Sequence, residues 1–203
     1  MARIHRHTLM AIVFRALVLL PVLPLMALAQ EPGSTAFKAF DWVDTSSPRA
    51  TLKSFLTGEK RYYDLIRSDG YTWENQQELS NILEQSERLF DLREIPLGHR
   101  RSVTHETTAL IREALARVPL PDINTIPDED EMAERLNDGK SAVYRVPDTP
   151  FEISRIDSGP DTGRYQFTQN TIEHAPAFYD EIKNYPYQPD HKAGCKGFHV
   201  LRL

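Results

Sequence analysis

Apolar residues recur at helical spacing in three successive segments of this chain. The first begins at Ser47-Pro48 and stops at Gly70, since serine caps helix N-termini and proline fits the first helical position. The second runs from about Trp73 to Leu92, and the third from about Val103 to Val118, where two prolines follow. Each apolar stripe has to be covered by another element, so we expect the three helices to pack together. The stripes consist of Leu52, Phe55, Leu56, Tyr62, Tyr63 and Ile66, of Leu79, Ile82, Leu83, Leu89 and Phe90, and of Leu110, Ile111, Ala114, Leu115 and Val118.

After about residue 140 the pattern changes to short segments rich in β-branched and aromatic residues. Residues 151–156 and 164–168 are expected to pair as a hairpin around a turn at 158–163, and 142–146 supplies a candidate third strand. Tyr165 and Phe167 alternate with Gln166, which predicts a strand with one buried face and Gln166 on the opposite face.

A last helix is expected after Thr168, whose hydroxyl can cap it. Pro176 is expected to split this helix, and Phe178, Tyr179 and Ile182 are expected to face inward. The patterns together predict an α+β fold that is mostly helical. It comprises about three packed amphipathic helices, a small sheet of two or three strands and a C-terminal helix.

The N-terminal residues have the pattern of a secretory signal peptide, with a short basic start and an uncharged apolar run at 16–29. The run ends in Ala27-Leu28-Ala29, which predicts cleavage before Gln30. A membrane anchor is the alternative, but Arg15 would lie inside the membrane-spanning stretch and disfavours it. We therefore expect residues 1–29 to be a signal peptide and the product to be exported and periplasmic. It would be membrane-anchored if the signal were not cleaved.

Four segments follow from these patterns: the signal at 1–29, a linker at 30–43, an extracytoplasmic domain at 44–189 and a divergent tail at 190–203 that we expect to be disordered. The signal contains three of the 24 basic residues, so 21 remain against 29 acidic residues, a net charge of −8. This balance disfavours nucleic acid and anionic membrane surfaces as partners. Cys195 is the single cysteine, which excludes an intramolecular disulfide.

Two clusters of side chains are candidates for metal binding, and each has a simpler interpretation. The acidic run 128–131 lacks the spacing of a calcium loop and suits a helix N-terminus after Pro127. His191, Cys195 and His199 could share a helix face and bind zinc, but glycines between them disfavour a helix. The sequence also contains no nucleophile elbow, phosphate loop or dinucleotide motif. We therefore assign no catalytic, cofactor-binding or metal-binding residue and expect a protein that is not an enzyme.

Several stretches together resemble the N-terminal extracytoplasmic extension of MscS-like mechanosensitive ion channels. They are 44–52 with Phe55-Leu56, 92–96, 118–121 with Ile126-Pro127, and most specifically 144–153, which leads through 159–160 and 163–168 to Phe178-Tyr179 and Pro186-Tyr187. The resemblance covers roughly residues 41–189. In that family, pore helices and a cytoplasmic domain would follow, whereas the sequence after Pro189 no longer resembles the family.

The resemblance implies a non-enzymatic extracytoplasmic domain, a truncated or free-standing relative with an interaction or regulatory role. The partners expected from it are a membrane channel or a second copy of the chain. An exported hydrolase or ligand-binding protein with an unrecognised site is the alternative interpretation.

Overall fold

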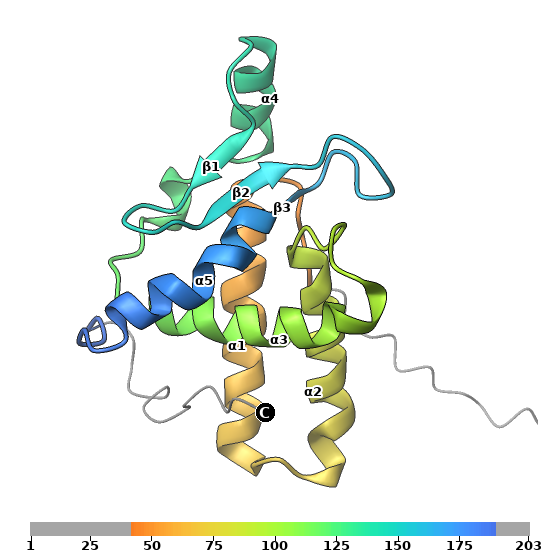
Figure 1. Cartoon of the computed structure of the whole chain (residues 1–203), viewed down its shortest axis with the longest axis vertical. Helices are drawn as coiled ribbons and strands as arrows, with labels where there is room; N and C mark the ends of the chain where they lie inside the picture. Colours follow the sequence, from red (N-terminus) through yellow and green to blue (C-terminus); the bar gives the residue numbers. More distant parts are fainter. Residues whose placement is uncertain (1–41, 190–203) are drawn as a thin grey trace, which may run out of the picture. The chain divides into compact units, whose positions relative to one another are not determined.

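The computed structural model describes residues 42–189 (Figure 1). The predictions of the signal peptide at 1–29, of most of the linker and of the tail at 190–203 concern residues outside this part. The same holds for the possible zinc ligands His191, Cys195 and His199. The elements of the described part confirm an α+β fold that is mostly helical and contains one three-stranded antiparallel sheet.

Helix α1 (Pro48–Asp69) begins and ends as its sequence predicts. The hydroxyl of Ser47 accepts a hydrogen bond from the N–H of Ala50 at 3.1 Å, which satisfies one of the free donors at the helix start. At the other end Gly70 has a φ of 67°, and its N–H donates to the carbonyl of Ile66 at 2.9 Å. A positive φ carries no steric cost at glycine, so the helix can stop and reverse at this position.

Helix α2 (Trp73–Ser86) continues as a short 3-10 turn η1 (Glu87–Leu89), so the prediction of a helix reaching Leu92 is wrong at its end. The chain leaves the helix because Phe90 forms a bridge with Phe167, and the N–H of Asp91 donates to the Phe167 carbonyl at 2.9 Å. Pairing with the sheet thus replaces the last helical turn.

Helix α3 (Leu97–Leu115) starts six residues before the predicted Val103. Its first turns are polar and largely exposed, so they lack the apolar stripe by which a helix is recognised in sequence. The C-terminal part of the helix is different, because every residue from Leu110 to Leu115 is buried, and the burial continues after the helix to Val118.

The sheet has the order β1-β2-β3, which confirms both the hairpin and the third strand. Its strands are β1 (Val143–Arg145), β2 (Glu152–Arg155) and β3 (Tyr165–Phe167). Before the sheet, the 3-10 turn η2 (Ile123–Thr125) is followed by the short helix α4 (Glu129–Asn137), which stands beside β1 in Figure 1.

Strand β3 is buried on both faces, so the prediction that Gln166 is exposed is wrong. Gln166 is 4 % exposed, and its amide donates to the carbonyl of Arg88 at 3.0 Å. The 3-10 turn η1 covers the face that a simple two-layer arrangement would leave to solvent. Tyr165 and Phe167 are buried as predicted.

Helix α5 (Gln169–Ile182) is continuous, so the prediction that Pro176 splits it is wrong. A proline inside a helix removes one hydrogen bond and costs about 3 kcal/mol or more. Burial of Ile172, Ala175 and Ile182 on one side of the helix offsets this cost. The cap at Thr168 is confirmed, since its hydroxyl accepts from the N–H of Thr171 at 3.2 Å.

The core lies where the sheet, the N-terminal part of α1, the C-terminal part of α3 and helix α5 meet (Figure 1). Phe167 is at its centre, with ring centroids 5.5 Å from Phe55 and 5.4 Å from Phe90. Phe178 and Tyr179 are partly buried against this core, and Ile182 is buried, which agrees with their predicted inward orientation. In the figure, α3 crosses α1 and α2, whose lower halves project beyond it as a helical hairpin.

Candidate functional site

The acidic run at 128–131 forms the start of helix α4, in agreement with the simpler of its two interpretations. Asp128 caps the helix by accepting from the N–H of Glu131 at 3.0 Å, and Glu131 accepts from the N–H of Asp128 at 2.9 Å. Arg49 of α1 lies against both carboxylates, 2.9 Å from Asp128 and 3.1 Å from Glu131. Among residues 42–189 no group of three or more histidine, cysteine or acidic side chains is arranged to hold a metal ion.

Four charged side chains form a cluster inside the domain, which we call the buried charge cluster: Glu59, Arg112, Glu113 and Arg117. Arg112 lies 3.3 Å from Glu59 of α1 and 3.1 Å from its neighbour Glu113. Arg117 lies 2.9 Å from Glu113, one turn further along the chain. All four residues are less than 9 % exposed, so each charge needs a partner inside the domain, and each has an oppositely charged one within the cluster.

Aromatic rings cover the buried charge cluster and connect it to the C-terminal segment. Arg112 lies 3.9 Å from the ring centre of Tyr63, and Arg117 lies 4.1 Å from that of Tyr187. The Tyr187 hydroxyl donates to Glu113 at 2.9 Å. Burial, followed by this hydrogen bond, raises the pKa of the Tyr187 hydroxyl, so it remains a donor. The cluster therefore fixes the segment after α5 against α3.

Among the residues that the structure describes, Glu59 has one charged partner and Glu113 has two. Burial raises the pKa of Glu59 from 4.5 to about 7, and the nearby guanidinium of Arg112 offsets only part of this effect. Sequence reasoning missed the cluster because charged residues are normally placed in solvent. The available signal was the Glu113/Arg117 pair, spaced as one helical turn inside an otherwise apolar stretch.

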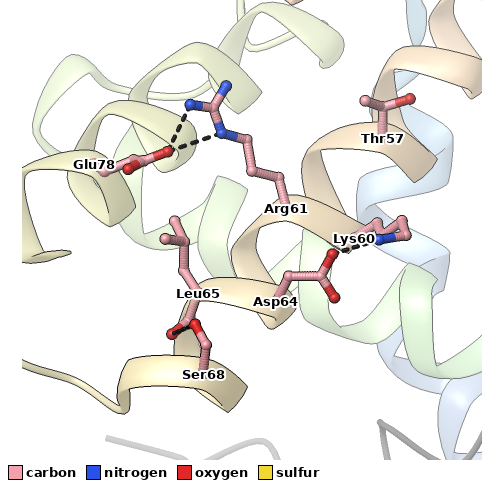
Figure 2. A pocket seen from close by; sticks show the side chains of 7 residues that line it. All are labelled: Thr57, Lys60, Arg61, Asp64, Leu65, Ser68 and Glu78. Carbon is pink, nitrogen blue, oxygen red and sulfur yellow. Dashed lines mark hydrogen bonds and ion pairs between the residues drawn. The ribbon is translucent and has the colours of Figure 1, made fainter.

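A shallow groove of about 470 Å³ runs along α1 toward α2 (Figure 2). Its charged groups are paired with each other: Lys60 with Asp64, and Arg61 with Glu78, where the Arg61 Nε lies 2.9 Å from the carboxylate. The remaining lining residues are Thr57, Leu65 and Ser68. Since its charges already have partners, the groove offers no specific support for the ligand-binding alternative.

Two aromatic side chains are exposed at the turn between α1 and α2, at the end of the projecting hairpin. Tyr71 is 68 % exposed and Trp73 is 85 % exposed. The turn that carries this aromatic tip is held firmly, because Thr72 and Asn75 cap α2 reciprocally and the Asn75 amide donates to the Gly70 carbonyl at 2.6 Å. The tip therefore presents two large aromatic rings from a turn whose backbone is hydrogen-bonded to the start of α2.

Comparisons with family models, with curated proteins and with solved structures found no match to this chain. Between residues 42 and 189, none of the helices is long and apolar enough to cross a membrane.

Proposed function

We propose that this chain is a non-enzymatic, exported interaction domain that binds another protein through the aromatic tip. The observation that carries the proposal is the exposure of Tyr71 and Trp73 on a turn closed by the capping hydrogen bonds of Thr72 and Asn75. The signal-like N-terminus and the resemblance to the extracytoplasmic extension of MscS-like channels support it from the sequence. On that basis we further propose a membrane channel or another envelope protein as the partner.

The tip has the properties of an interface anchor. Tryptophan and tyrosine provide most of the binding energy in many interfaces, since they bury a large area and lose little side-chain entropy. A turn that is already ordered before binding also reduces the entropic cost of association. Trp73 is far more exposed than the large apolar residues of the core, which are covered almost completely. Its position is explained if a partner covers it.

Site-specific photo-crosslinking in the producing cell tests this function. A photoreactive phenylalanine derivative at position 73 should give one discrete covalent adduct with a protein of the cell envelope. The same derivative at Tyr185, which is 55 % exposed on another part of the surface, serves as the matched control and should not give this adduct.

Competition adds a second measurement. Excess chain with native Trp73 should suppress the adduct, and excess Trp73→Ala chain should not. Identical adduct patterns at positions 73 and 185, or equal suppression by both competitors, would contradict the proposal.

A further inference from the structure

The two edges of the sheet differ in whether other segments of the chain form hydrogen bonds with them. At the β3 edge, Asp91 donates to the Phe167 carbonyl at 2.9 Å, and Tyr165 donates to the Thr45 carbonyl at 2.8 Å. Segments on either side of the helical hairpin thus cover that edge. Strand β1 forms the opposite edge, beside α4 in Figure 1.

The hydrogen bonds at both ends of the β1–β2 pair show which backbone groups of β1 face outward. The N–H of Val146 donates to the Phe151 carbonyl at 2.9 Å, and the N–H of Arg155 donates to the Ala142 carbonyl at 3.3 Å. In an antiparallel ladder, alternate residues bond to the same neighbour. The backbone N–H and C=O groups of residues 142, 144 and 146 therefore point toward β2, and those of residues 143 and 145 point away from the sheet.

The outward groups form a short strand edge that is ready to pair. Val143 and Arg145 each present one N–H and one C=O, and no backbone hydrogen bond to either of them occurs within residues 42–189. Val143 is also among the exposed large apolar residues, at 37 %. Unpaired backbone groups in a row are a template for another strand.

We propose that β1 pairs antiparallel with β1 of a second copy about a two-fold axis at Tyr144, which joins the two sheets into one. This surface is separate from the aromatic tip, and the proposal goes beyond the function given above. In this register Val143 lies opposite Arg145 of the second copy, and the two residues exchange both of their backbone hydrogen bonds. The two-fold axis generates the same pair a second time, with Arg145 opposite Val143 of the second copy.

The side chains suit this register. Arg145 is already paired with Glu152, with its Nε 3.1 Å from the carboxylate, so the two arginines across the axis carry compensated charges. Tyr144 meets its counterpart in the close, non-hydrogen-bonded position, where aromatic pairs stabilise antiparallel strands. Val143 packs over the stem of the opposing arginine.

The length of the edge favours a second copy over a long extended peptide. Pro147 has no N–H and follows directly after Val146, so pairing cannot continue past the end of β1. A two-fold pair uses the open edge of both copies and closes at a dimer. Because the contact is short, we expect weak association that depends on protein concentration.

Disulfide trapping tests the register directly. Tyr144→Cys, in a chain that also carries Cys195→Ser, places two thiols in opposing positions whose Cα atoms are about 4.5 Å apart in such a ladder. Mild oxidation of the purified chain should give a covalent dimer. Val143→Cys in the same background is the matched control: residue 143 faces residue 145 of the second copy, so its thiols are not opposite each other and it should give no covalent dimer. Equal cross-linking of the two variants, or none in either, would overturn the register.

A backbone variant tests the pairing itself. Val143→Pro removes an outward N–H and leaves the bonds between β1 and β2 in place. In sedimentation equilibrium under reducing conditions, the unsubstituted chain should show a monomer–dimer equilibrium, and Val143→Pro should weaken it by about tenfold or more. Its circular dichroism melt should match that of the unsubstituted chain; if it does not, the disulfide comparison decides alone. A strictly monomeric unsubstituted chain, or a dimer abolished by Trp73→Ala and not by Val143→Pro, would refute the proposal.

Discussion

Removing the charge of Glu59 should make the stability of this domain less dependent on pH. Glu59 is 8 % exposed and forms an ion pair with Arg112, and its pKa is raised from 4.5 to about 7 by burial. The raised pKa means that the folded state binds a proton at this carboxyl more tightly than the unfolded state does. Burial of the charged form therefore opposes folding, in spite of the ion pair.

The sign and size of the pH effect on the free energy of unfolding follow from this pKa shift. The stabilising effect of the neutral carboxyl is fully present below the unfolded pKa of 4.5 and is lost as the pH rises through about 7. At about 1.4 kcal/mol per pKa unit, the free energy of unfolding should fall by about 2–3 kcal/mol between pH 5 and pH 8 on account of this group. Glu59→Gln keeps the shape and a hydrogen-bond acceptor for Arg112 but cannot ionise, so this loss should disappear.

Urea unfolding followed by circular dichroism at both pH values measures the effect. The relevant quantity is the change with pH of the difference between the two chains, because contributions of other groups, such as the histidines, cancel in it. Glu59→Gln should be the more stable chain at pH 8, and the two should approach each other at pH 5. A difference in stability that stays constant over this pH range would refute the reasoning. A variant less stable than the unsubstituted chain at pH 8 would also refute it, and would show that the ion pair outweighs the cost of burial.

Three further predictions concern other parts of the chain. Gly58→Ala should destabilise the domain by about 1–3 kcal/mol in thermal melts, because a Cβ there would lie 2.1 Å from an indole carbon of Trp42. Gly98→Ala is the control: a Cβ at Gly98 would have nothing within 4 Å, so this variant should be neutral or slightly stabilising in the same melts. Phe167→Ala should lower the free energy of unfolding by about 3–5 kcal/mol, because it removes a buried ring. Gln166→Ala should lower it by about 1–3 kcal/mol, because the buried Arg88 carbonyl loses its donor. A Gln166→Ala chain with unchanged stability would contradict the burial of both faces of β3. The exported product should begin at Gln30, and N-terminal sequencing that finds the intact start would contradict signal cleavage.

Local chemistry determined most of the element pattern. The start of α1 at Ser47 and its end at Gly70 depend on capping interactions within a few residues, and these can be recognised in any sequence. The hairpin turn at 158–163 is similar: Gly159 and Gly163 adopt φ values of 91° and 90°, which other residues rarely reach. Such features require no knowledge of the remaining fold.

Sequence predictions failed where a distant segment decided the outcome. Gln166 alternates with apolar residues as an exposed residue would, and it is buried only because η1 packs over β3. Pro176 is a helix breaker by local rules, and packing against α3 outweighs its cost.

The two candidate surfaces and the buried charge cluster depend on tertiary structure for the same reason. Nothing near Glu59 in the sequence indicates that Arg112, 53 positions away, will share its burial. The exposure of Trp73 likewise follows from the projection of the α1–α2 hairpin beyond α3, and not from its apolar character, which predicts burial. Hydrophobic periodicity specifies which face of an element is covered, but which element covers it, and what remains uncovered, is decided only when the whole chain packs.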